Sequence, residues 1–74
     1  MRDEQQEMAR RVREVRVERF GDGGVPMMAD LLCVPARTWR SFEAGARIPS
    51  PVIRRFLEVT GTSPRWLRTG KGPR

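Results

Sequence analysis

The distribution of glycine and proline constrains the fold of this chain more than any other feature of its sequence. All seven glycines and all six prolines lie after residue 20 of the 74 residues. Because both residue types interrupt helices, only residues 1–20 can form one long uninterrupted helix. Within that segment, Met8, Val12 and Val15 follow helical spacing. The sequence therefore predicts a long first helix over residues 1–20 and shorter elements after it.

Two short helices are predicted in the middle of the chain. Pro26 suits the first turn of a helix over residues 26–32, where its missing N–H group costs nothing. The apolar residues of that helix are spaced three and four apart, which predicts that they share one face; they are Met28, Leu31 and Leu32. A second proline precedes a helix over residues 36–44, with Trp39 and Phe42 on its apolar side.

The last third of the chain carries two matching signals for a helix start. Ser50 and Ser63 are each followed by proline, and a serine N-cap before a first-turn proline is typical of helix N-termini. These signals predict closing helices within residues 50–70 and a loose tail over residues 71–74. With no strand-like alternation, the sequence predicts one all-α domain over residues 1–74, a compact bundle of about five helices.

The composition argues against an enzyme. The chain has no histidine, no tyrosine and one cysteine, so a catalytic triad, a histidine base or a two-cysteine zinc site cannot be built. We expect no cofactor and no metal. Cys33 lies among apolar residues and is expected to be a small packed residue. A single cysteine and no segment typical of a signal peptide or membrane span predict a cytoplasmic protein.

Positive charge is concentrated in the second half of the chain. The formal net charge is +6, and fourteen of the fifteen basic residues are arginine. Residues 1–35 carry a net charge of −1, whereas residues 36–74 carry +7. A guanidinium group pairs with two acceptors at once, as phosphate and guanine offer them. This composition favours a polyanionic partner.

A polar strip runs along the predicted helix over residues 36–44. Helical spacing places four residues on one solvent-facing side, namely Arg37, Arg40, Ser41 and Ala44. A short helix, a tight turn and a second short helix with such a strip are the parts of a helix-turn-helix that binds DNA. The pattern over residues 25–45 therefore indicates double-stranded DNA as the partner.

These residues resemble the Xre-type, phage-repressor-like helix-turn-helix family over about residues 11–72 of this chain. The resemblance is carried by the strings MADLLCV at 28–34, RTWRSFEAG at 37–45 and IPS at 48–50. It extends to the closing Thr-Gly, Pro-x-Trp-Leu and Thr-Gly-x-Gly series within residues 60–72. The resemblance implies a lambda-repressor-like fold and a transcriptional regulator of bacterial or phage type, whose second helix of the pair lies in the major groove.

Carried onto this sequence, the family pattern implies that four residues contact bases, namely Ala36, Arg37, Arg40 and Ser41. Arg37 and Arg40 would pair bidentately with guanine, and Ala36 would touch a thymine methyl group. One short helix contacts only a few base pairs, so we expect a homodimer on DNA. We expect neither a membrane nor a small-molecule substrate as a partner.

Other side chains would support this interface. Arg47, Arg54 and Arg55 are candidates for phosphate contacts, which position a protein on DNA without carrying sequence information. Glu43 occupies a position where the family usually has glutamate. It would be structural, paired with either Arg40 or Arg47.

Three positions depart from the family pattern. The family usually places glutamine near the start of the first helix of the pair, glycine in the turn and serine at the N-cap of the second helix. Here these positions hold Val25, Cys33 and Pro35, which removes hydrogen bonds to DNA and to the helix. Two alternatives therefore stay open: a protein-interaction module on a degenerate helix-turn-helix fold, and a nonspecific nucleic-acid binder driven by charge.

Overall fold

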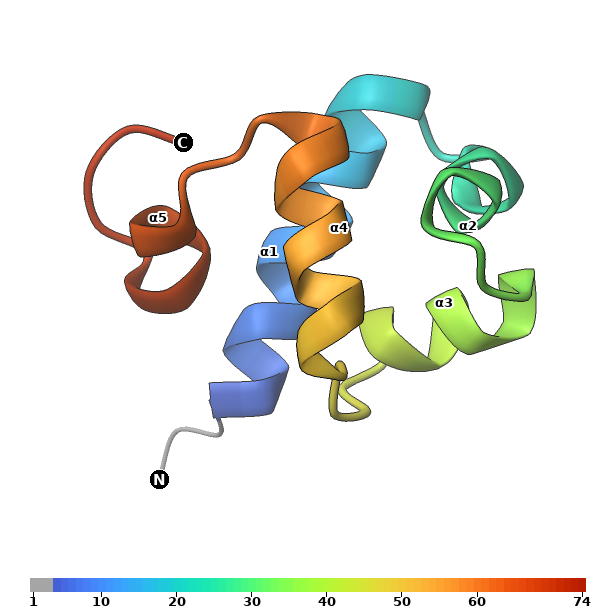
Figure 1. The fold of residues 1–74 in the computed structure, drawn as a ribbon, viewed down its shortest axis with the longest axis horizontal. Coiled ribbons are helices and arrows are strands. Elements are labelled where there is room, and N and C mark those ends of the chain that lie inside the picture. The colour runs from blue at the N-terminus through green and yellow to red at the C-terminus, as the bar shows by residue number, and fades with distance from the viewer. Residues whose placement is uncertain (1–3) are drawn as a thin grey trace.

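Five helices pack around one core in the computed structural model, which describes residues 4–74 (Figure 1). They are α1 (Glu4–Phe20), α2 (Val25–Leu32), α3 (Ala36–Glu43), α4 (Ser50–Thr60) and α5 (Pro64–Thr69). The described residues form no strand, which confirms the all-α prediction; the start of the predicted first helix, residues 1–3, lies outside them. None of these helices has the length and apolar character needed to cross a bilayer.

The two longest helices form the centre of the molecule. Figure 1 shows α1 and α4 in the middle, α2 and α3 on one side of them, and α5 on the other side. Each of the five helices buries apolar residues in this arrangement. The position of α3 at the edge of the bundle leaves one side of that helix open to solvent.

An aromatic cluster fixes which face of α3 is buried. Trp39 is fully buried and stacks on Phe56 of α4, with ring centroids 5.8 Å apart. Phe42 meets Trp39 edge to face at 6.0 Å. Each such aromatic contact contributes about 0.5–1.5 kcal/mol beyond the area it buries. Trp39 is thus a core residue, as its place on the apolar side of the predicted helix indicated.

The helix boundaries follow the proline and glycine signals closely, with one difference in capping. Ser63 is the predicted N-cap of α5, and its hydroxyl accepts a hydrogen bond from the backbone N–H of Trp66 at 3.3 Å. The prediction that Ser50 caps α4 is wrong. Pro49 holds the N-cap position in an extended conformation, so Ser50 is already the first helical residue and forms no cap bond.

The prediction for the buried face of α2 needs one correction. Its buried residues are spaced three, four and seven apart and form a continuous stripe: Val25, Met28, Ala29 and Leu32. Leu31 was expected on this face, but it lies at the edge of the stripe and is 38% exposed. Met27, one turn earlier, is 56% exposed. The helix therefore presents a small apolar edge to solvent.

Cys33 is exposed, so the prediction that it packs in the core is wrong. The residue ends α2 in the left-handed conformation, with φ 59° and ψ 40°, and its N–H donates to the carbonyl of Asp30 at 3.1 Å. The chain reverses direction here, which turns the side chain outward despite its apolar neighbours in sequence. A residue with a Cβ atom is strained there by about 1–2 kcal/mol, which explains why a glycine would suit the position.

The last residue of the C-terminal tail contacts α1. The guanidinium of Arg74 lies 3.1 Å from the Glu14 carboxylate and pairs with Glu18 as well, both on α1. It also sits 5.3 Å from the centroid of the Trp66 ring. These contacts are partly exposed and each contributes about 0–1 kcal/mol. Together they hold the end of the chain against α1.

We predict that Cys33→Gly stabilises the protein by about 0.5–1 kcal/mol. Glycine relieves the strain of the left-handed conformation in the folded state. This gain in free energy exceeds the cost of the extra conformational entropy that glycine gives the unfolded chain. Urea denaturation measures the change in the free energy of unfolding. Cys33→Ala is the matched control, because it removes the thiol and keeps the strained Cβ atom. Equal stability of the two variants would contradict this explanation.

Candidate nucleic-acid interface

The structure brings the four predicted base-contacting residues onto one side of α3. Arg37, Arg40 and Ser41 are exposed, and Ala36 is half-buried at the start of the helix. The Ser41 hydroxyl donates a hydrogen bond to the carbonyl of Arg37 at 3.1 Å, so it is partly engaged by its own helix. Within residues 4–74, the guanidinium groups of Arg37 and Arg40 form no ion pair or hydrogen bond. Both are available to a ligand.

The three predicted phosphate-contacting arginines differ in their surroundings. Arg47 is exposed in the loop between α3 and α4, and Arg54 is exposed on α4. Neither guanidinium has a hydrogen-bond or ion-pair partner in the part of the chain that the structure describes. Arg55 is exposed too, but its Nε atom donates to the carbonyl of Leu31 at 2.9 Å. It therefore caps the end of α2, a role that the sequence did not indicate.

A buried ion pair anchors the last turn of α3. Arg16 of α1 is only 5% exposed. Its Nη2 atom lies 2.7 Å from one carboxylate oxygen of Glu43, and its Nε atom lies 2.9 Å from the other. Trp39 donates its indole N–H to the same carboxylate. The prediction that Glu43 pairs with Arg40 or Arg47 is wrong, because Glu43 points inward from the side of α3 that carries Trp39.

The rest of the Arg16 guanidinium is satisfied by backbone. Its Nη1 atom donates to the carbonyls of Gly21 and Asp22 at 2.8 and 3.1 Å. The hydrogen bond to Glu43 raises the pKa of Arg16, against the opposing effect of burial. A base with a raised pKa in the folded state loses its stabilising effect only as the pH rises through that pKa. Arg16 therefore remains charged at every ordinary working pH, and it ties α1 and the turn after it to α3.

Sequence reasoning missed this pair, although one signal was present. Arg16 lies four residues after Val12 and next to Val15, so it falls on the buried stripe of α1. A charged residue on an apolar stripe needs a buried partner, because an unpaired charge there is costly. The spacing alone could not identify Glu43, which lies 27 residues away.

The start of α2 and the turn between α2 and α3 show how the three departures from the family pattern are accommodated. Val25 is buried and offers no polar group to a ligand. Cys33 takes the left-handed conformation expected of the turn glycine. Pro35 is the N-cap of α3 and supplies no side-chain hydrogen bond. The carbonyl of Pro35 accepts hydrogen bonds from the backbone N–H groups of Thr38 and Trp39, at 3.0 and 3.1 Å. The first turn of α3 therefore forms without a side-chain cap.

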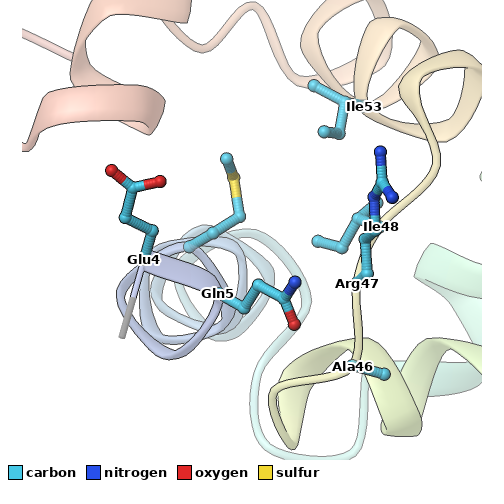
Figure 2. Close-up of a pocket in the computed structure, with 7 residues that line it drawn as sticks. Glu4, Gln5, Ala46, Arg47, Ile48 and Ile53 are labelled. Atoms are coloured by element: carbon cyan, nitrogen blue, oxygen red, sulfur yellow. The ribbon is translucent and has the colours of Figure 1, made fainter. Parts of the chain in front are cut away.

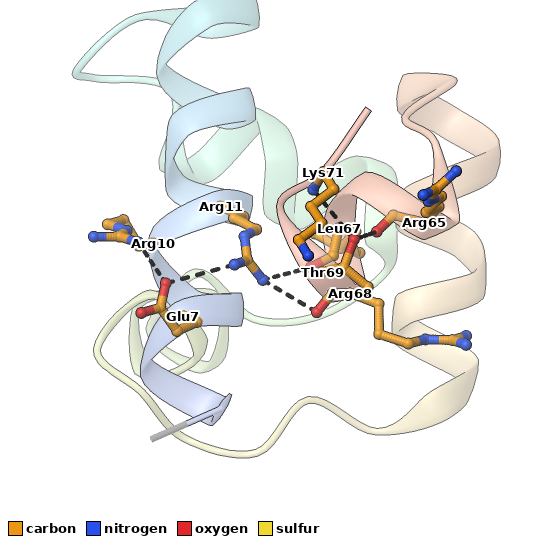
Figure 3. Close-up of polar contacts among 8 residues, drawn as sticks. All are labelled: Glu7, Arg10, Arg11, Arg65, Leu67, Arg68, Thr69 and Lys71. Atoms are coloured by element: carbon orange, nitrogen blue, oxygen red, sulfur yellow. Dashed lines mark hydrogen bonds and ion pairs between the residues drawn. The ribbon is translucent and has the colours of Figure 1, made fainter. Parts of the chain in front are cut away.

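On the opposite side of the bundle, an arginine joins α1 to α5 (Figure 3). Arg11 donates to the carbonyls of Leu67 and Arg68 at 3.1 and 3.3 Å and lies 3.5 Å from the Glu7 carboxylate. It thereby satisfies carbonyls at the end of α5. The Arg65 side chain has no such contact within the described residues. Part of the positive charge of the chain is thus used to hold helices together.

No protein-family model, no curated protein and no solved structure matches this chain. The Xre-type resemblance therefore remains a prediction from the sequence. What the structure adds is the arrangement of the side chains, above all the exposed arginines of α3 and the buried pair that anchors it.

We predict that Arg16→Met destabilises the protein by about 3–5 kcal/mol, because it leaves the Glu43 carboxylate buried without its partner. The double variant Arg16→Met with Glu43→Gln should regain at least half of this loss, since glutamine carries no charge and can still accept from Trp39. Urea denaturation measures both effects. Arg13→Met, at an exposed position of the same helix, is the control. A loss below about 1 kcal/mol for Arg16→Met would show that the pair does not hold the fold together.

Proposed function

We propose that this protein is a sequence-specific DNA-binding transcriptional regulator that places α3 in the major groove. The observation that carries the proposal is the pair of exposed guanidinium groups on α3, Arg37 and Arg40, which have no partner within residues 4–74. The major groove of B-DNA is wide enough to admit an α-helix. Because Trp39 and the Glu43 pair hold the other side of α3, the two arginines extend from a fixed support.

The spacing of the two arginines suggests what they would contact. Three residues of helix correspond to a rise of about 4.5 Å. Successive bases of one strand are about 3.4 Å apart, so Arg37 and Arg40 would contact neighbouring base pairs. An arginine that contacts a base pairs most often with O6 and N7 of guanine. We therefore expect a binding site that contains two guanines close together.

The charge of the second half of the chain supports binding to a phosphate backbone. Within residues 4–74, Arg47 and Arg54 are exposed and unpaired, and Arg55 uses only its Nε atom, in the bond to Leu31. Each phosphate contact releases counterions, which lowers the slope of log affinity against log salt by about 0.9. Contacts of this kind would give affinity without sequence preference, whereas α3 would supply the preference.

We further propose that the protein binds DNA as a homodimer in the cytoplasm. Two helices of a dimer would enter successive major grooves about 34–36 Å apart. The molecule measures 29 × 25 × 23 Å, so two copies fit side by side at that spacing. A dimer would double the number of base pairs contacted, which one eight-residue helix cannot do alone.

A second candidate function, a protein-interaction module, is favoured by the apolar edge of α2. Met27 is 56% exposed and Leu31 is 38% exposed, one turn apart. Such an edge could pack against a partner protein. The loss of polar side chains at Val25 and Pro35, where the family pattern has glutamine and serine, also suits a chain that no longer binds operators.

We predict that Arg37→Ala and Arg40→Ala each weaken binding to the preferred duplex by about 1–3 kcal/mol, roughly 5- to 150-fold, and relax preference at one position. Fluorescence anisotropy at about 0.15 M salt would measure this, using a duplex selected from a random pool. Arg13→Ala is the matched control, since Arg13 is also exposed but lies on α1.

The same assay separates the alternatives. Wild-type affinity that falls steeply with salt and is equal for selected and scrambled duplexes would identify a nonspecific binder. The absence of any salt-dependent DNA affinity would reject the proposal, and a tight protein complex in size-exclusion chromatography or a pulldown would then favour a protein-interaction module.

A further inference from the structure

Arg55 differs from its exposed neighbours Arg47 and Arg54 because one edge of its guanidinium group is held by backbone. Its Nε atom donates to the carbonyl of Leu31 at 2.9 Å, which joins α4 to the last turn of α2. A guanidinium group carries five N–H donors in a planar fork. The bond to Leu31 uses one of them, so the donors on the two terminal nitrogens remain.

Both ends of the Arg55 side chain are attached to fixed parts of the bundle. The next residue, Phe56, is fully buried, and its ring stacks on Trp39 of α3. The backbone of Arg55 therefore belongs to the stretch of α4 that supports α3. At the other end, the guanidinium group is held at Leu31, shortly before the turn that leads into α3. The bond thus restricts the side chain before any ligand binds.

The terminal nitrogens of Arg55 have no partner within residues 4–74. Two carboxylates come from the same pair of helices: Asp30 precedes Leu31 on α2, and Glu58 follows Arg55 by less than one turn of α4. Neither forms an ion pair with Arg55 among the described residues. Two parallel N–H groups of a guanidinium match two oxygens of one phosphate group. The open edge of Arg55 therefore suits a phosphate.

Arg47 and Arg54 are exposed as well but lack such a bond. Figure 2 shows Arg47 extending from the loop after α3, beside Ile48 and Ile53 at the margin of an open groove. Neither Arg47 nor Arg54 has a hydrogen-bond or ion-pair partner in the described part of the chain. A free arginine side chain loses conformational entropy when it binds an anion. For Arg55, the bond to Leu31 has already removed part of that freedom.

We propose that Arg55 binds one phosphate group of the DNA backbone through its terminal nitrogens while its Nε atom keeps the bond to Leu31. The inference rests on the proposed function and names a positioning residue for it. The phosphate is held near the end of α2 by a guanidinium group that is attached to α2 and α4 at once. Because phosphate contacts fix the orientation of a protein on the duplex, Arg55 ties the DNA backbone to the helices that position α3.

The test compares variants that keep the charge at two adjacent positions. Fluorescence anisotropy measures duplex affinity over a range of salt concentrations. Arg55→Lys keeps the charge but replaces the planar fork by a compact ammonium group on a flexible stem. We expect a loss of affinity of about 2- to 10-fold with an unchanged salt slope. Arg54→Lys is the matched control and should stay within about twofold of the wild type, since Arg54 has no internal bond to lose.

A third variant, Arg55→Gln, separates a phosphate contact from a purely structural role. Loss of the contact should reduce the magnitude of the slope of log affinity against log salt by about 0.9. A residue that only caps α2 would leave this slope unchanged. Urea denaturation checks that every variant is folded under the assay conditions. Without DNA, the Nε–H NMR signal of Arg55 should exchange with water more slowly than that of Arg54, because only the former is hydrogen-bonded.

The outcomes separate this inference from the proposed function. An unchanged salt slope for Arg55→Gln, or equal affinities of Arg55→Lys and Arg54→Lys, would overturn the inference and leave the DNA function standing. Equal affinity of the wild type for selected and scrambled duplexes would reject the sequence-specific function. The effects expected at Arg55 do not depend on base sequence, so they would still support the phosphate contact in that case. A wild-type protein without salt-dependent DNA affinity would reject both.

Discussion

The buried pair of Arg16 and Glu43 is the interaction on which the arrangement of α3 depends. It joins α1, the turn after α1 and the last turn of α3 through one guanidinium group. A buried ion pair adds little stability compared with apolar residues of similar volume, but the loss of one partner is costly. We therefore infer that the pair acts mainly by selecting one arrangement of the helices. With Glu43 and Trp39 turned inward, helical geometry leaves Arg37 and Arg40 on the outside.

Much of this fold could be predicted because its signals are local. Proline and glycine mark helix ends within a few residues of where they act, so all five helices were placed almost correctly from the sequence. The exposed strip of α3 followed from periodicity alone, since Trp39 and Phe42 define the buried side and helical spacing puts Arg37, Arg40 and Ser41 on the other side. No distant contact was needed for either inference.

The errors concern contacts that are remote in sequence or set by backbone conformation. Periodicity placed Arg16 on a buried stripe but could not indicate a partner 27 residues away. The contact between Arg74 and Glu14, which lie 60 residues apart, could not be predicted for the same reason. The prediction for Cys33 was wrong for a different reason. Its neighbours in sequence are apolar, but its left-handed backbone conformation turns the side chain to solvent. A hydropathy pattern contains no information about that conformation.

Arginine performs two different tasks in this chain, and composition cannot separate them. Arg11 and Arg55 cap helix ends, and Arg16 neutralises a buried carboxylate, so each of them uses donors inside the molecule. The guanidinium groups of Arg37 and Arg40 donate no hydrogen bond within the described residues. The net charge of +7 over residues 36–74 therefore does not measure the charge offered to a ligand. The arginines left without internal partners define where a polyanion would bind, and these lie on α3, on the loop after it and on α4 as well as on α1 and α5. On α3, two of them, Arg37 and Arg40, lie three residues apart on a helix whose other side is held by Trp39 and the Glu43 pair.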